Sequence, residues 1–493
     1  MYRIGFGVAN ISPTEDLYGK TGLLGFGNEG TRLVTGVDEN APMMAMCLAV
    51  TDADGKTVLL YATDTAAVGD GEGADIARIL EQDYDVPKGC VMISANHQHA
   101  TPDYVNGYDA LFVRQMVAAG AAALADRKAV TDVSVQIVKL PENKYNFVRN
   151  LQYTDSAGKP IPGAMNTPNH NDIGRKDLEG IVAKERKTYE STADSTVQLV
   201  RITREGDEKP IVISNFQTHP LLASNGLDTV ATADLVGIYR NRLEQELGCR
   251  AMYFTGPSGN IHPFSNIDPQ YYFKNRDYIT FGQQLAKEVA QTIREDGWVN
   301  AMGDQKVHIE TRTCGYDVNF NSFPAWLRST NPDIADKSDA EVLSMIEDFA
   351  NGIWSYDGGY TRKTTEEDLN TYGIYSKYHC KYMVIRQKNK PGDKKYLTIS
   401  TVAFGDVAFV VAPYEMFDTN GMEIKAASPY PVTMIATMAD MPTAERCSSC
   451  NGYLPSTLGY ENSGYSVDIA QFKKGIGENL REDFLTMLGH MKG

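Results

Sequence analysis

The chain has 493 residues, which is enough for two average domains or for one large α/β domain with insertions. Its hydrophobic content of 42% and charged content of 22% are ordinary for a globular protein. The net charge of -16 argues against nucleic acids and anionic membrane surfaces as main partners, because both are polyanions. A neutral lipid or another small molecule is compatible with this charge.

The sequence also bears on membrane insertion, location and disulfides. It contains no run of about 18 apolar residues, so we expect no transmembrane helix. The N-terminus lacks the features of a signal peptide, which favours the cytoplasm, or a secreted or periplasmic protein if a leader was removed. The seven cysteines suit reduced thiols better than a disulfide framework, and Cys447 and Cys450 have no second C-x-x-C pair that would complete a zinc site.

The first 70 residues predict three strands, over 4–11, 43–51 and 57–63. Asp64 follows the third of these strands. A carboxylate at a strand end can orient a metal-binding histidine without touching the metal. It can also cap a helix, and a helix is expected to begin near Gly73. The sequence leaves both roles open for Asp64.

A pair of histidines follows the next predicted strand. Residues 91–95 are apolar or small, as in a buried strand, and Asn96, His97, Gln98 and His99 come directly after them. If the extended backbone continues, the two histidines lie on one side of the chain. Two imidazoles at a strand end can bind one metal ion, or one can bind it while the other transfers a proton. The alternative is two loop histidines without a common function.

Strands and helices continue to alternate in the next part of the chain. We expect a helix over 113–127 and a strand over 133–140. This alternation predicts an α/β fold with mixed β-sheets, surrounding helices and functional residues at strand ends. Residues 142–182 form a long polar segment that carries Arg149, and such a loop in a compact domain is usually functional or disordered.

A third histidine follows a strand in the middle of the chain. Strands are expected over 197–203 and 210–215, and His219 comes just after the second of them. A short strand over 250–254 leads into the small-residue segment 255–263. The glycines of that segment let backbone N–H groups approach a ligand closely, or they make only a tight turn.

The last third of the chain carries a distinct segment and an isolated acid. Residues 316–390 are polar, aromatic-rich and partly helical, and we interpret them as an insertion or cap. Glu415 lies just beyond an almost wholly apolar strand, where an unpaired charge is costly, so a cation or strong donor is expected beside it. The other predicted elements are helices over 234–247, 278–295 and 470–488 and strands over 305–313, 396–404, 407–412 and 431–437.

Six segments, in the correct order, resemble the neutral (non-lysosomal) ceramidase family. They are GFGVANISP at 5–13, NHQH at 96–99, NFQTHP at 215–220, GNIHP at 259–263, the segment 405–415 that ends in PYE, and NGYLP at 451–455 followed by a second tyrosine. No counterpart of the immunoglobulin-like C-terminal domain of true ceramidases is visible in the sequence. The resemblance implies a single ceramidase-like catalytic domain over 1–493, with 316–390 as its insertion.

The resemblance also implies one zinc ion in the active site. The family's two histidines, glutamate and tyrosine carry over to the following ligands: His97, His219, Glu415 and Tyr453. His99 and Tyr465 fall where the family places residues for oxyanion stabilisation and proton delivery to the leaving amine. His262 stands where the family has Ser or Asn, so we expect a catalytic residue with a changed donor.

Five further residues are expected to contact the substrate: Asn96, Asp103, Arg149, Gly259 and Asn260. The resemblance implies a zinc-dependent hydrolase that cleaves a non-peptide N-acyl bond with metal-activated water. Asp103 and His262 make the expected pocket more polar than a lipid pocket needs. One alternative is therefore a zinc-dependent hydrolase or lyase acting on a small polar or carbohydrate-like compound. The other alternative is a binding protein without catalysis on the same scaffold.

Overall fold

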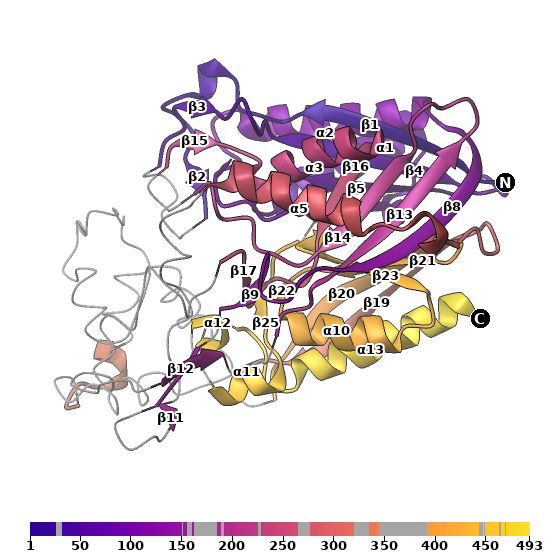
Figure 1. Cartoon of the computed structure of the whole chain (residues 1–493). Helices are drawn as coiled ribbons and strands as arrows, with labels where there is room; N and C mark the ends of the chain where they lie inside the picture. The colour runs from indigo at the N-terminus through magenta and orange to yellow at the C-terminus, as the bar shows by residue number, and fades with distance from the viewer. Residues whose placement is uncertain are drawn as a thin grey trace.

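The structure is a computed structural model of the whole chain (Figure 1). It describes residues 1–25, 32–149, 151–154, 160–161, 185–188, 192–224, 228–264, 277–319, 335–342, 344, 390, 392–442, 447, 449–462, 465–468 and 470–493. For residues 151–154, 160–161, 185–188, 462, 465 and 468 the description is limited to the backbone. Most of the predicted insertion 316–390 lies outside the described residues.

Most of the longer strands belong to one large sheet. In spatial order it contains β16 (Arg250–Thr255), β14 (Ile211–Phe216), β13 (Thr196–Arg204), β8 (Lys128–Lys139), β1 (Arg3–Asn10), β4 (Met44–Thr51), β5 (Thr57–Thr63), β6 (Val91–Ala95) and β24 (Ala439–Asp440), with β18 (Val299–Asn300) beside β8. Neighbours are antiparallel except for two parallel pairs, β14 with β16 and β5 with β6. β4 and β5 are apolar at almost every position because both faces of the sheet are covered.

A second sheet packs against the first. It contains β19 (Val307–Asp317), β20 (Lys394–Phe404), β21 (Val407–Ala412) and β23 (Val432–Thr437) in that order. Val402, Phe409 and Met434 of this sheet share one buried cluster with Leu48 and Met252 of the large sheet. The main hydrophobic core therefore lies between the two sheets, and Figure 1 shows them as the inner layers of the molecule.

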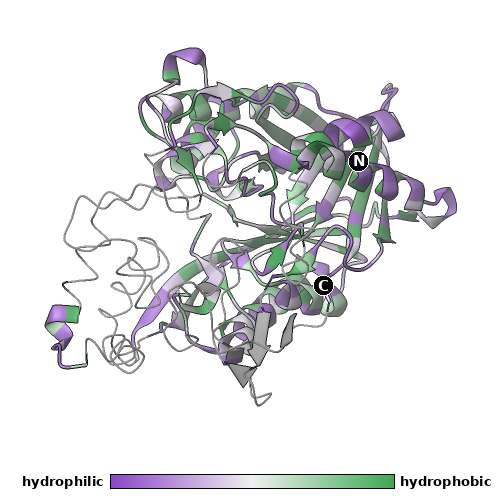
Figure 2. Cartoon of the chain, turned by 60° about the vertical axis from the view of Figure 1, so that its left-hand side comes forward, coloured by the Kyte–Doolittle hydropathy of each residue, from purple (hydrophilic) through white to green (hydrophobic). Residues whose placement is uncertain are grey.

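Helices form the two outer layers. α1 (Asp70–Tyr84), α2 (Tyr108–Ala125), α3 (Asp234–Leu247) and α5 (Tyr278–Thr292) cover the large sheet, and α10 (Asp418–Ala427) and α13 (Ile476–Lys492) cover the small one (Figure 1). α2 lies directly on β1, because a Cβ at Gly5 would be 1.9 Å from the carbonyl oxygen of Ala123. Figure 2 shows hydrophobic residues concentrated along the inner strands and hydrophilic ones on the outer surfaces.

Two strands that are distant in the large sheet meet at the site. β16 and β6 are seven steps apart in the strand order and, followed through the pairings, run in opposite directions. Thr255 at the end of β16 donates from its hydroxyl to the carbonyl oxygen of Asn96, just after β6, at 2.9 Å.

The predicted fold class is confirmed. The large mixed sheet, the second sheet and the covering helices are those of an α/β protein, and α3 and β5 have the predicted bounds. α10 was not predicted, and the last helix begins later than expected because Gly475, with a φ of 96°, precedes its first residue. Within the described part of the chain, no helix has both the length and the apolar character needed to cross a membrane.

Candidate metal centre

Three histidine side chains meet at one point inside the molecule. His97 and His99 follow β6 and His219 follows β14, so each comes from just beyond a strand of the large sheet. The Nε2 atom of His99 lies 3.3 Å from that of His97 and 2.9 Å from that of His219. The ring nitrogens that could bind a metal lie within 4.8 Å of one another. The three residues form a group that could hold one metal ion.

Backbone carbonyls orient two of these rings. The Nδ1 atom of His97 is 2.7 Å from the carbonyl oxygen of Ala66, and that of His219 is 3.1 Å from the carbonyl oxygen of Ser258. A carbonyl oxygen only accepts hydrogen bonds, so each Nδ1 carries the proton and each Nε2 presents its lone pair to the centre. This arrangement is the one that metal-binding histidines normally show.

The charge state of the centre also suits a metal. Burial lowers the pKa of His99 and His219 well below the usual range, and the nearby cationic side chains add to this effect. Burial likewise disfavours charge on His97, but the Glu415 carboxylate outweighs it and raises the pKa of His97. His99 and His219 are therefore neutral at pH 7, the state in which imidazole binds a metal.

Glu415 supplies a carboxylate next to the histidines. Its Oε2 atom lies 3.4 Å from the Nε2 atom of His97. The same oxygen is buried and accepts no hydrogen bond from the described residues. A buried carboxylate oxygen without a donor is costly, and a divalent cation between it and the imidazole lone pairs would remove that cost. The donor set of nitrogen and oxygen atoms fits zinc.

Tyr453 lies beside Glu415 on a short parallel ladder. β22 (Glu415–Met416) pairs with β25 (Tyr453–Leu454), and Glu415 and Tyr453 are register partners. The Arg149 guanidinium stacks over the Tyr453 ring, 5.2 Å from its centroid. The pairing brings the two predicted ligands together from segments 38 residues apart, and binding of the metal by the Tyr453 hydroxyl stays a prediction.

The extended backbone does not continue after β6. The strand ends at Ala95, and His97 has a φ of 66°, in the left-handed region. Asn96 and Gln98, on either side of it, both donate to Oδ1 of Asp64, at 3.3 and 3.1 Å. The histidines converge through this anchored turn and not through the alternation of a strand.

Asp64 does not cap α1, and among the described residues it bonds no histidine directly. Gly69, and not Asp64, precedes the first residue of α1. The carboxylate is fully buried and receives two hydrogen bonds from the Arg240 guanidinium, at 2.7 and 2.5 Å. It also accepts from Asn96 and Gln98, which flank His97, so it orients that histidine through its neighbours. Nothing in the sequence marks Arg240, which lies 176 positions away.

Arg149 and His262 form a second polar group beside the histidines. β9 (Phe147–Val148) pairs with β17 (Ile261–His262), which brings Arg149 next to His262. The Nη1 atom of Arg149 donates to Nε2 of His262 at 3.2 Å, and its Nη2 atom donates to the Ser466 hydroxyl at 3.2 Å. The rings of His262 and His219 are 6.2 Å apart. Predicted residues from two distant segments are thus brought together.

Three residues predicted to contact substrate also hold the surrounding backbone in place. Asn96 Oδ1 accepts from the backbone N–H of Thr255 at 3.1 Å, in addition to its bond with Asp64. Asn260 Oδ1 accepts from the backbone N–H of Asp418 at 2.8 Å. Gly259 approaches backbone and not a ligand, because a Cβ there would lie 2.3 Å from the carbonyl oxygen of Glu415.

The two remaining predicted residues are Asp103 and Tyr465. Asp103 accepts a hydrogen bond from the backbone N–H of Tyr104 at 2.8 Å and is only partly buried. Tyr465 is the first residue of α12 (Tyr465–Asp468), and its side chain lies outside the described residues. Ser466 in the same helix contacts Arg149, so this helix lies at the site.

Arg32 is a site residue that sequence reasoning missed. Its guanidinium donates to the carbonyl oxygens of Leu24, Gly25 and His99 at 2.7, 2.9 and 3.1 Å. It thereby fixes the backbone of His99 against the N-terminal loop. No local pattern marks an arginine that reaches the backbone carbonyl of a residue 67 positions away.

Comparisons with known proteins agree with the fold. The structure of neutral ceramidase from Pseudomonas aeruginosa matches with a TM-score of 0.64 and 15% sequence identity, over 100% of this chain and 74% of that one. A ceramidase complexed with C2 matches with a TM-score of 0.64 and 14% identity, over 99% of this chain and 74% of that one. This chain has the neutral ceramidase fold. No family model and no curated protein matches the sequence.

Proposed function

We propose that the protein is a zinc-dependent hydrolase that cleaves a non-peptide N-acyl bond. The observation that supports this most directly is the convergence of three imidazole nitrogens beside a buried carboxylate. The likeness in fold to neutral ceramidase is consistent with this chemistry. We further propose that residues 1–493 act as one catalytic domain.

In this proposal four residues hold the ion: His97, His219, Glu415 and Tyr453. When bound, zinc lowers the pKa of a water molecule and polarises the substrate carbonyl. His97 and His219 are held in the required tautomer by the carbonyl oxygens of Ala66 and Ser258. The imidazole, carboxylate and phenol groups of these four residues match the preference of zinc for nitrogen and oxygen ligands.

His99 is proposed to move the proton. Its Nε2 atom faces the same centre as the other two histidines, and its lowered pKa keeps it neutral at pH 7. A neutral imidazole can accept a proton from water and then deliver it to the leaving amine. Tyr465 is proposed to assist the leaving group or the oxyanion, as the resemblance implies. Each contribution of this kind is worth on the order of 10² in rate.

Arg149 and His262 are proposed to bind the polar end of the substrate. Both side chains are buried, and the Nη1 atom of Arg149 points to His262 while its face covers Tyr453. A guanidinium in this position can stabilise negative charge that develops on the carbonyl oxygen. The same polar group favours a second candidate, a zinc-dependent hydrolase or lyase acting on a smaller polar or carbohydrate-like compound.

Two measurements test the proposal together. Elemental analysis of purified protein should give about one zinc per chain, and hydrolysis should be assayed on fluorogenic short-chain ceramides, polar N-acyl compounds and sugars. Turnover of the ceramides supports the first candidate, and turnover only of the polar compounds or sugars supports the second. Stoichiometric zinc without turnover of any substrate would leave a binding protein, and a chain that binds no zinc would contradict the metal centre.

A further inference from the structure

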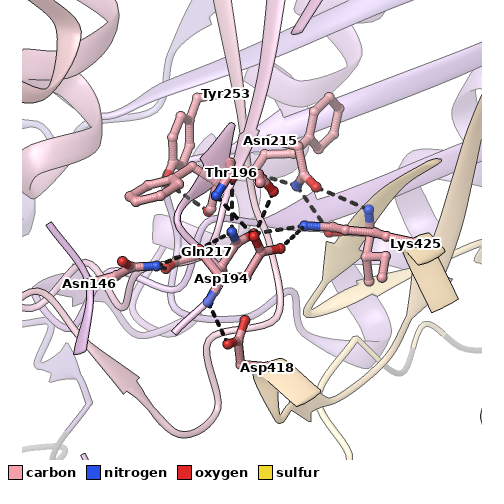
Figure 3. Close-up of polar contacts among 11 residues, drawn as sticks. Asn146, Asp194, Thr196, Asn215, Gln217, Tyr253, Asp418 and Lys425 are labelled. Carbon is pink, nitrogen blue, oxygen red and sulfur yellow. Dashed lines mark hydrogen bonds and ion pairs between the residues drawn. The ribbon is translucent and has the colours of Figure 1, made fainter. Parts of the chain in front are cut away.

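A buried polar cluster includes Gln217, two residues before His219. It consists of Asp194, Gln217 and Lys425, and we refer to it as the Lys425 cluster (Figure 3). The Lys425 ammonium donates to Oδ2 of Asp194 at 3.1 Å and to Oε1 of Gln217 at 2.9 Å. The side chains of Lys425 and Asp194 are only 10% and 8% exposed. A lysine and an aspartate are therefore paired in the interior.

Other buried groups complete the cluster. The Gln217 amide donates to the carbonyl oxygens of Asp194 and Thr196, and the Thr196 hydroxyl donates to Oδ1 of Asp194 at 2.6 Å. Asn146 donates to the carbonyl oxygens of Asp194 and Gln217 at 2.7 and 3.1 Å. Figure 3 shows these contacts converging on Asp194 and Gln217 from different segments. These hydrogen bonds join the residues into one network, in which the carbonyl oxygen of Asp194 accepts from both Asn146 and Gln217.

The cluster joins the segments that carry the site. Gln217 is two residues before His219, and Asn146 is three residues before Arg149. Lys425 belongs to α10, whose first residue is Asp418, three residues after Glu415. The carboxylate of Asp418 also accepts from the backbone N–H of Asp194 at 2.8 Å. Through these contacts the cluster spans the distance between the histidine side and the glutamate side of the centre.

A buried ion pair of this kind needs an explanation other than stability. Replacement of such a pair by well-packed apolar residues is often neutral or stabilising, because both charges must be taken out of water. Burial alone would raise the pKa of Asp194, but the Lys425 ammonium and the Thr196 donors outweigh it and lower the pKa. The pair is therefore ionised, and the Lys425 ammonium holds one oxygen of Asp194 and one oxygen of Gln217 in a fixed place.

We propose that Lys425 is a positioning residue for the metal centre. Its ammonium sets the separation between the His219 loop and the segment that carries Glu415, by binding Asp194 and Gln217 at once. This inference rests on the proposed metal site, and it assigns to α10 a role beyond covering the small sheet. Residues that orient metal ligands without touching the ion typically change metal affinity by 10–100-fold when they are replaced.

The test compares zinc binding by the wild-type chain and by Lys425→Met, which keeps the length of the stem and removes the charge. We expect the zinc dissociation constant, measured by competition with a chromophoric chelator, to rise at least about tenfold. The visible spectrum of the Co²⁺-loaded protein should also change, since it reports the geometry of the ligands. Lys425→Arg retains the charge and should keep the dissociation constant within a few-fold of the wild-type value.

Arg204→Met is the matched control. Arg204 is fully buried and paired with Asp126 and Asp207, but it lies eight residues along β13 from Thr196, about 26 Å at 3.3 Å per residue. This variant should lower the melting temperature without changing zinc affinity or the Co²⁺ spectrum. If Lys425→Met does not fold, Lys425→Gln is used in its place with the same expectation.

The outcomes separate this inference from the proposed function. A wild-type chain that binds no zinc overturns both. A wild-type chain that binds zinc, with Lys425 variants that are less stable but keep its dissociation constant and Co²⁺ spectrum, overturns the positioning role alone. Weaker zinc binding in Lys425→Met and Arg204→Met to the same extent would also overturn it, because the effect would then follow from stability.

Discussion

His97 occupies the most constrained backbone position of the candidate metal centre. A non-glycine residue at a φ of 66° costs roughly 1–2 kcal/mol relative to ordinary conformations. The turn is maintained because Asn96 and Gln98 are both held by Asp64, which is itself held by Arg240 and by the backbone N–H of Met44. The left-handed conformation directs the His97 imidazole back toward His99 and His219.

Single histidine replacements distinguish a ligand from a proton carrier. We expect His97→Ala and His219→Ala to lose zinc and activity together. Each variant removes an imidazole whose Nε2 atom is directed at the centre by the hydrogen bond between its Nδ1 atom and a backbone carbonyl oxygen. His99→Ala should retain about one zinc per chain and lose activity by about 10². Elemental analysis and an assay on the best substrate check both values.

The control for these variants is His308→Ala, since His308 is a partly exposed residue of β19 that pairs with Asp304. It should keep both zinc and turnover. Loss of zinc from His99→Ala would make His99 a third nitrogen ligand and would remove the proposed proton transfer from it.

The placement of whole elements depends on close backbone contacts. The N–H of Gly259 donates to the carbonyl oxygen of Met416 at 2.8 Å, so the loop after β16 packs directly on β22. Ser258 in the same loop supplies the carbonyl oxygen that orients His219, while β22 begins with Glu415. A histidine and a carboxylate from different sheets are therefore set relative to each other by one short stretch of backbone.

Gly259→Ala tests this coupling at the level of the element. The added Cβ would lie 2.3 Å from the carbonyl oxygen of Glu415, so the loop or β22 has to shift. We expect a loss of about 1–3 kcal/mol in the free energy of unfolding and a weaker zinc affinity. Chemical denaturation and chelator competition measure the two quantities.

Gly71→Ala is the matched control, because Gly71 lies in α1 and a Cβ there meets nothing within 4 Å. It should stabilise the chain by up to about 1 kcal/mol and leave zinc binding unchanged. An unchanged zinc affinity in Gly259→Ala would mean that the loop can move without moving the ligands.

The elements differ in how far their sequences predict them. The strands that end before His97, His219 and Glu415 are apolar runs bounded by turn residues, and the structure confirms all three. α10 escaped prediction because it contains two weak helix formers, Asn420 and Gly421, in only 10 residues. Lys425 on this helix was missed as well, because its partners lie more than 200 positions away and leave no local pattern.

An ion-pair network lies at the other end of the large sheet from the metal centre. Arg204, at the last position of β13, is fully buried and contacts Asp126 and Asp207. Arg250 and Lys128 add contacts to the same two carboxylates. The sequence predicted the strand that begins with Arg250, but Lys128 and Arg204 lie just outside the predicted strands 133–140 and 197–203. It did not predict the network, because sheet order and twist decide which strand ends meet. Asp207 precedes β14 and His219 follows it, so the network and the centre lie at opposite ends of this strand.

This separation predicts a dependence of stability on pH that does not involve the metal. Burial opposes the charge on Asp126 and Asp207, but the hydrogen bonds and charges around them, with Arg204 common to both, outweigh it and lower both pKa values below the ordinary 3.8. Their contribution is therefore fully present above about pH 4 and is lost as the pH falls through the lowered values. Arg204→Met should lose about 3–5 kcal/mol at pH 7, because a buried pair is broken.

The same variant should also lose less stability than the wild type between pH 4 and pH 2, since the pKa values of its two carboxyl groups are no longer held as low. Urea denaturation of chelator-treated protein at pH 7, 4, 3 and 2 measures both effects without a contribution from bound zinc. Parallel curves for the two proteins over this range would show that the acid sensitivity arises elsewhere, and that Arg204 contributes packing but not charge to this end of the sheet.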